Sequence, residues 1–176
     1  RERERERERM KKPHALVVAF PAQGHIGPFM ELCISLATRG SFRITVANHA
    51  DSAIRKLEPY YGPGGPDIHL IEIPPNLFPS SHDMGRYSVI THMCLSLRDL
   101  TNLEPFVNMV TDLLGSDPPI TCIFSDFYVP FTHALARALN LPRIVFFPQS
   151  AGSLASYMSI FRRNPLPSPG TNCLAT

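Results

Sequence analysis

Short runs of consecutive apolar residues alternate along this chain with segments in which apolar residues recur every three or four positions. The clearest runs lie at 15–20, 120–126 and 143–147. Continuous apolar runs of this length are typical of strands that are buried on both faces, whereas the wider spacing indicates helices with one buried face. The pattern therefore predicts buried strands that alternate with helices.

The stretch at 15–40 shows this alternation most clearly. Ala15–Phe20 predicts a strand, Pro21 and Gly24 break the apolar run, and the positions that follow predict a helix that stops at Gly40. The apolar positions with helical spacing are Ile26, Phe29, Met30, Cys33 and Ala37.

The same two patterns continue along the rest of the chain. Strands are predicted at 43–47, 68–73, 120–126 and 143–147, and helices at 51–57, 86–114, 131–139 and 150–161. Pro105 interrupts the longest helical pattern, so we expect a kink there, or two helices that meet near Glu104. Asn140 and Pro142 are expected to end the helix at 131–139.

This order of elements predicts a fold of the α/β class, a doubly wound, Rossmann-like domain with a parallel sheet. In the common strand order 3-2-1-4-5, the first and fourth strands are neighbours, and ligands bind beyond their carboxyl ends. The predicted domain covers residues 12–163. Residues 1–11, which begin with a strict Arg-Glu repeat, are expected to form a disordered charged tail, either upstream sequence or an added extension, and 164–176 a linker or frayed end.

The composition fits a folded protein of one domain. The chain has 176 residues, of which 44% are hydrophobic and 18% are charged. Its formal net charge of +2 gives no support for a nucleic acid partner. No apolar segment approaches the ~20 residues that span a bilayer, so we expect a soluble, cytoplasmic protein without a membrane partner. The four cysteines, Cys33, Cys94, Cys122 and Cys173, form no CxxC pair and are expected to be thiols, mostly buried.

His25 and Asp126 are the strongest candidates for chemistry. His25 lies where the first loop meets the first helix, and Asp126 ends the fourth strand. If the first and fourth strands are neighbours, both side chains reach one crevice. An imidazole paired with a carboxylate can remove a proton, because one ring nitrogen accepts it while the carboxylate holds the other N–H. Two structural roles stay open, since Asp126 could cap the following helix and a lone His is often structural.

Two long segments carry a resemblance to a known family. They are PHALVVAFPAQGHIGPFMELCISLATRG at 13–40 and ITCIFSDFYVPFTHALARALNLPRIVFF at 120–147. They resemble the N-terminal, acceptor-binding half of plant UDP-dependent glycosyltransferases of the GT-B fold, and the similarity runs in order from Pro13 to Pro167. The PPNLFPSS and FFPQSAGSLASYM segments are most similar to members that glucosylate flavonols and related phenols. In the family, the His of the PAQGH motif is the general base and the later Asp orients it, which implies these roles for His25 and Asp126.

The resemblance implies the transfer of a sugar, expected to be glucose, from a UDP-sugar to a hydroxyl of a phenolic or flavonoid molecule, with inversion. The UDP-sugar is a co-substrate, and neither a cofactor nor a metal is expected. Proton removal would be concerted with attack on the anomeric carbon. The implied substrate-binding residues, whose apolar members also fit core positions, are Gly24, Phe78, Met84, His92, Met93, Phe147, Gln149 and Ser150.

Two features depart from the family pattern. Many members carry a Thr that contacts the sugar just after the last strand, where this chain has Pro148 followed by Gln149 and Ser150. The donor-binding domain, with its Trp-rich signature, is not expected within these 176 residues, which contain no Trp. The chain alone is therefore expected to be nearly inactive, because transfer depends on holding the donor in line with the base. The face toward that domain is expected to be apolar and to promote self-association.

Two other functions were weighed against this one. The same domain could be a non-catalytic module that binds a small molecule and keeps only the phenol pocket. A nicotinamide-dependent oxidoreductase is less favoured, because GHIGP at 24–28 is not GxGxxG and the second strand does not end on an acidic residue.

Overall fold

The computed structural model of the chain describes residues 12–39, 42–48, 65–73 and 104–163. The chain divides into two compact units, residues 1–146 and residues 147–176. The first unit contains all the described strands, and the described part of the second contains one helix, α7 (Ala151–Arg163). None of the helices within the described ranges is both long enough and apolar enough to cross a membrane.

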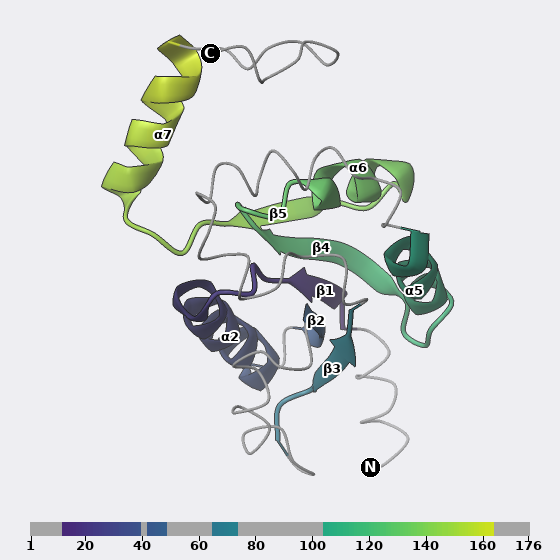
Figure 1. Cartoon of the computed structure of the whole chain (residues 1–176). Coiled ribbons are helices and arrows are strands. Elements are labelled where there is room, and N and C mark those ends of the chain that lie inside the picture. The colour runs from purple at the N-terminus through teal and green to yellow at the C-terminus, as the bar shows by residue number, and fades with distance from the viewer. Residues whose placement is uncertain (1–11, 40–41, 49–64, 74–103, 164–176) are drawn as a thin grey trace. The chain divides into compact units, whose positions relative to one another are not determined.

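The first unit is built on a five-stranded parallel sheet (Figure 1). Its strands are β1 (His14–Val18), β2 (Arg43–Asn48), β3 (Ile68–Glu72), β4 (Ile120–Asp126) and β5 (Arg143–Phe146). Their order across the sheet is β3-β2-β1-β4-β5, and every neighbouring pair is parallel. This is the common order 3-2-1-4-5, so β1 and β4 lie side by side where the order reverses.

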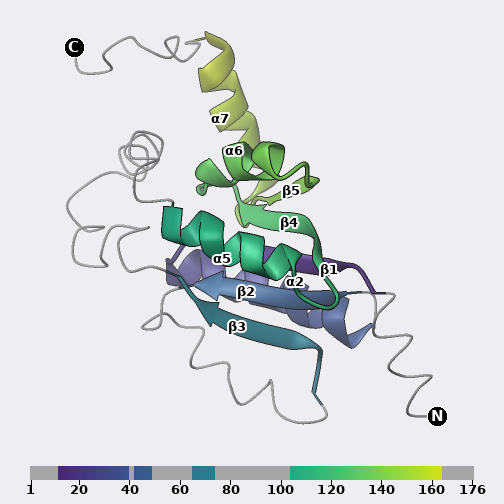
Figure 2. The same ribbon diagram turned by 90° about the vertical axis from the view of Figure 1, so that its right-hand side faces the viewer.

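Helices cover both faces of the sheet. Helix α2 (Gln23–Thr38) lies on one face, whereas α5 (Glu104–Leu114) and α6 (Phe131–Ala138) lie on the other (Figure 2). Parallel strands need crossover connections, and helices that return on opposite faces produce the doubly wound arrangement. The predicted fold class is confirmed.

The core is packed between the sheet and these helices. On the α2 face, the buried cluster consists of Ala15, Val17, Ala19, Ile26, Phe29, Met30, Cys33, Ala37, Ile44, Val46, Ile68, Cys122 and Phe124. On the other face, the ring centroids of Phe106 and Phe131 lie 5.6 Å apart, which joins α5 to α6. Side chains alternate along a strand, so both faces of β1 are buried, as its continuous apolar sequence predicts.

Helix α2 begins at Gln23, earlier than the predicted start, and places His25 in its first turn. The helix continues through Pro28, which lacks the N–H that would donate to the carbonyl of Gly24. Gly24 is exposed at the start of the helix, where solvent can replace that missing donor. A proline so near the helix start therefore removes one backbone hydrogen bond of the helix without ending it.

Two helix boundaries follow the predicted signals. Helix α5 begins at Glu104 with Pro105 in its first turn, where a missing N–H loses no intrahelical bond. Asn140 follows α6 in the left-handed conformation, with φ of 52°. The N–H of Leu141 then donates to the carbonyl of Ala136 at 2.9 Å, which closes the helix end.

Strand β5 corrects one prediction. Its apolar sequence predicts a buried strand, but Ile144 and Val145 are 51% and 45% exposed. These neighbours point to opposite faces, so neither face of β5 is fully covered. Its one neighbour in the described sheet is β4, and an apolar run alone does not distinguish a central strand from an edge strand.

Other predictions can be followed only in part. Cys33 and Cys122 are free and buried, as predicted. Cys94, Cys173 and the predicted helical segments at 51–57 and 86–103 lie outside the described residues.

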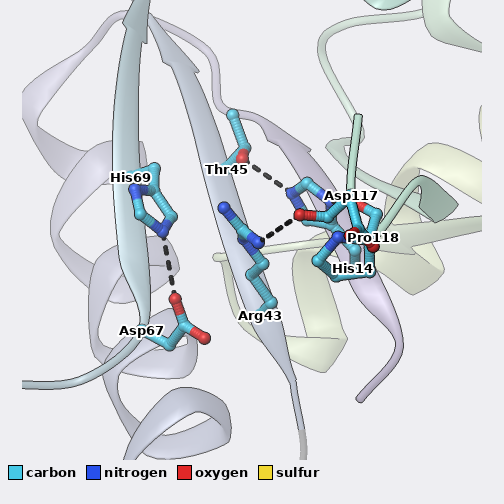
Figure 3. A network of polar contacts seen from close by, with 7 residues as sticks. All are labelled: His14, Arg43, Thr45, Asp67, His69, Asp117 and Pro118. Atoms are coloured by element: carbon cyan, nitrogen blue, oxygen red, sulfur yellow. Dashed lines mark hydrogen bonds and ion pairs between the residues drawn. The ribbon is translucent and has the colours of Figure 1, made fainter. Parts of the chain in front are cut away.

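A buried histidine ties together the amino ends of the strands (Figure 3). His14, at the start of β1, is 1% exposed. Its Nδ1 lies 2.8 Å from the carbonyl of Pro118, and its Nε2 lies 2.7 Å from the hydroxyl of Thr45. A carbonyl only accepts, so Nδ1 donates to Pro118 and the neutral ring accepts from Thr45 at Nε2.

Charged groups surround this histidine (Figure 3). Arg43 donates to the Asp117 carbonyl at 3.1 Å, and His69 lies 3.0 Å from the carboxylate of Asp67. Burial is the main cause that lowers the pKa of His14, and the charges of Arg43 and His69 act in the same direction. The Pro118 carbonyl and Asp67 oppose this shift. The neutral ring is therefore the form that the fold favours.

Candidate active site

The site lies beyond the carboxyl ends of β1 and β4. These strands pair in parallel, with Val18 opposite Ser125. The chain leaves β1 through a short connection into α2, so His25 lies just beyond the end of β1. Asp126 is the last residue of β4. The two residues are therefore brought together by the strand order, as the sequence predicts.

His25 and Asp126 form a direct contact. The Nδ1 atom of His25 lies 2.8 Å from Oδ2 of Asp126, and the two side chains are 13% and 0% exposed. A carboxylate only accepts, so Nδ1 donates and Nε2 of the neutral ring carries the lone pair. Among the described residues, Nε2 has no hydrogen-bond partner. This arrangement can take a proton from a hydroxyl at Nε2 while Asp126 stabilises the charged ring.

The second oxygen of Asp126 is held by the backbone. The N–H of Tyr128 donates to Oδ1 at 2.9 Å, which is a local turn of the Asx type. Helix α6 has Pro130 at its N-cap, with no capping bond from a side chain. The alternative that Asp126 caps the following helix is therefore wrong.

Two aromatic rings, neither of them a candidate from the sequence pattern, flank the imidazole. The ring centroids of Phe20 and Tyr128 lie 5.2 Å and 5.0 Å from that of His25, at interplanar angles of 64° and 81°. Phe20 follows β1 and Tyr128 follows β4 by two residues. Their positions, two residues beyond the ends of adjacent strands, were the one feature of the sequence that could have placed them near His25.

The substrate-binding predictions are only partly within the described residues. Phe78, Met84, His92 and Met93 lie outside them. Gly24 is exposed next to His25, and a Cβ atom at this position would meet none of the described residues within 4 Å. The role of Gly24 in binding stays a prediction.

Three further candidates belong to the second unit. The ring of Phe147 lies 6.3 Å from that of Tyr157, and Gln149 is exposed before α7. Ser150 Oγ accepts from the N–H of Ser153 at 3.2 Å, which caps the start of α7. Ser150 therefore has a structural role, and binding by these three residues stays a prediction.

Metal chemistry has no visible centre in the part of the chain that the structure describes. No three His, Cys, Asp or Glu side chains are grouped there so that they could hold a metal ion.

Known proteins resemble this chain in sequence over nearly its whole length. It is 35% identical over 173 residues to UDP-glycosyltransferase 85A8 of Stevia rebaudiana, which covers 94% of this chain and 35% of that protein. It is 36% identical over 156 residues to the (R)-mandelonitrile beta-glucosyltransferase of Prunus dulcis, with coverage of 86% and 32%. The chain spans about a third of the length of these curated relatives. No family model matches it.

Solved structures share the fold. UGT71G1 of Medicago truncatula, complexed with UDP-glucose, matches with a TM-score of 0.66 and 16% identity, over 95% of this chain and 36% of that chain. UGT89C1 of Arabidopsis thaliana, complexed with UDP-L-rhamnose, matches with a TM-score of 0.64 and 24% identity, over 83% and 39%. In sequence the chain is therefore similar to about a third of the length of plant UDP-glycosyltransferases, and it shares its fold with part of their solved GT-B structures.

Proposed function

We propose that this chain supplies the acceptor side and the general base of a UDP-dependent glycosyltransferase. The enzyme would transfer glucose from a UDP-sugar to a hydroxyl of a small phenolic or flavonoid molecule, with inversion. The observation that carries the proposal is the contact of 2.8 Å between His25 Nδ1 and Asp126 Oδ2, which leaves Nε2 as the acceptor of a proton.

The reaction uses the two ends of the imidazole differently. The acceptor hydroxyl donates its proton to Nε2 of His25 while its oxygen forms a bond to the anomeric carbon. The bond from that carbon to UDP breaks on the opposite side, and the electron pair leaves with the diphosphate. Asp126 stabilises the imidazolium through the Nδ1 hydrogen bond. Attack and departure on opposite sides invert the configuration of the sugar.

The relatives support a small acceptor that carries a hydroxyl, whereas its phenolic class rests on the sequence resemblance and on one structure with the same fold. One relative is named for (R)-mandelonitrile and another for 7-deoxyloganetin, and a structure of Phytolacca americana UGT2 with the same fold holds pterostilbene and a UDP-sugar analogue. These are small organic molecules rather than polymers. A small acceptor also suits a base that lies mostly buried, with 13% of its side chain exposed.

A chimera tests this proposal. The chain is joined to the remaining, donor-binding part of the Stevia rebaudiana relative, and glucose transfer from UDP-glucose to a panel of flavonols and simpler phenols is followed by mass spectrometry. We expect transfer by the chimera and almost none by the chain alone. His25→Ala should reduce the rate by about 10²- to 10⁴-fold, whereas His133→Ala, at an exposed histidine of α6, should not.

Three outcomes would contradict the proposal. A folded chimera that binds UDP-glucose but glycosylates nothing would exclude the transferase function for this domain. Unchanged acceptor binding by the chain and its His25→Ala variant, without transfer by the chimera, would instead support the non-catalytic binding module. A rate that is insensitive to His25→Ala would remove the assigned base.

A further inference from the structure

Tyr128 contacts both members of the candidate catalytic pair. Its backbone N–H donates to Asp126 Oδ1 at 2.9 Å, and its ring centroid lies 5.0 Å from that of His25. The other carboxylate oxygen, Oδ2, accepts from the imidazole. The two oxygens of Asp126 are therefore divided between the backbone of Tyr128 and the ring that Tyr128 flanks.

Phe20 completes a triangle of rings. Its centroid lies 5.2 Å from that of His25 and 5.9 Å from that of Tyr128. Phe20 and Tyr128 are only 5% and 2% exposed, so neither ring can move aside without opening a cavity in the packed interior. The imidazole thus lies against two rings that are themselves fixed by the core.

This packing supplies a constraint that the hydrogen bond lacks. The torsions about the Cα–Cβ and Cβ–Cγ bonds of His25 still allow the imidazole plane to turn to some extent while the single bond from Nδ1 to Oδ2 is kept. Such a turn changes the direction of Nε2, the atom that would accept the proton. The rings of Phe20 and Tyr128 stand at 64° and 81° to the imidazole plane and obstruct that turn.

We propose that Tyr128 is a positioning residue for the pair of His25 and Asp126. Its backbone fixes the carboxylate, its ring fixes the plane of the imidazole, and Phe20 acts as a second stop. Tyr128 acts through His25 rather than on the reacting atoms. The catalytic consequence rests on the proposed function, whereas the fixed orientation of the imidazole does not.

The orientation can be measured without catalysis. In the whole chain labelled with ¹⁵N-histidine, the wild type should show an exchange-protected Nδ1–H resonance that His25→Gln abolishes, which assigns it. Tyr128→Phe keeps the ring and should retain this resonance. Tyr128→Leu removes the ring and should broaden or abolish it. Tyr157→Leu, which removes a ring in the second unit, is the matched control and should retain it.

The catalytic arm uses the chimera. Tyr128→Leu should lower kcat by up to about 100-fold, because the base is misdirected, while KM for UDP-glucose stays unchanged. Tyr128→Phe should keep the wild-type rate. If circular dichroism shows that Tyr128→Leu does not fold, Phe20→Leu is measured in its place with the same expected losses.

The two proposals fail in different ways. An unchanged Nδ1–H resonance together with an unchanged kcat in the folded leucine variant would overturn the role of Tyr128. A resonance that is lost in this variant, together with a wild-type chimera that transfers no glucose, would overturn the proposed function and leave the positioning role intact.

Discussion

Replacing Asp126 with Asn tests the direction of the hydrogen bond on which the base depends. The new side chain keeps the shape of the old one, but only its oxygen accepts. The N–H of Tyr128, 2.9 Å from Oδ1, requires the amide oxygen at that position. The amide NH₂ must then face Nδ1 of His25 across 2.8 Å. Two donors cannot share that contact, so the proton of the neutral imidazole moves to Nε2.

The consequences can be given magnitudes. With Nε2 protonated, the ring has no lone pair for the acceptor hydroxyl, and the same change of tautomer in a Ser-His-Asp triad costs about 10⁴-fold in rate. That factor corresponds to about 5.5 kcal/mol in the activation free energy. The substitution also removes the charge from the group that accepts the two hydrogen bonds, from Tyr128 and from His25. Each of these changes lowers the free energy of unfolding by about 1 kcal/mol, so the variant should lose about 2 kcal/mol.

Two measurements check this prediction. The ¹⁵N shifts of the His25 ring in the chain report which nitrogen carries the proton, and urea unfolding reports the stability. Asp112→Asn, at an exposed carboxylate of α5, is the control and should change neither. The interpretation of the pair is refuted if Nε2 stays unprotonated in the folded Asp126→Asn variant, or if glucose transfer by the corresponding chimera is unaffected.

Three further predictions concern stability and association. Because burial lowers the pKa of His14 below 6.5, the unfolded state binds more protons just below this pH. The free energy of unfolding should therefore reach its highest value above about pH 6.5 and fall on acidification. In urea titrations, it should depend less steeply on pH for His14→Gln. Asn140→Ala should lower the free energy of unfolding by about 1 kcal/mol in thermal melts, because φ is 52° there, whereas Asn140→Gly should not. The exposed apolar edge at β5 should make the chain self-associate in sedimentation experiments, and Val145→Lys should reduce this; a wild-type chain that is a clean monomer at all concentrations would contradict it.

The central part of the fold could be predicted because its signals are local. The apolar run at 120–126 gives the bounds of β4, and Asn140 gives the end of α6. The exposure of β5 could not be predicted, because it depends on which strands are neighbours rather than on the run itself. The predicted start of α2 is too late, because Gly24 and Pro28 do not break the helix here. Solvent can donate to the Gly24 carbonyl in place of the N–H that Pro28 lacks.

In the candidate site, too, some features could be predicted from the sequence and others could not. The meeting of His25 with Asp126 followed from the strand order alone. The rings of Phe20 and Tyr128 did not, because an aromatic residue beside a strand end fits the core, a binding pocket or a catalytic pair equally well. The network of His14 and Thr45 also escaped prediction, since its partners come from separate strands and share no sequence pattern.

The adjacency of β1 and β4 determines when the contact between His25 and Asp126 can form during synthesis. His25 and Asp126 are 101 positions apart in the chain, and their contact forms only after β4 has been inserted beside β1. A nascent chain that has completed β1, β2 and β3 already contains His25, but one edge of β1 is still unpaired. Closing so long a loop is slow compared with forming local helices. The Nδ1 hydrogen bond thus marks the insertion of β4 beside β1, and a chain that has folded only through β3 lacks the candidate pair.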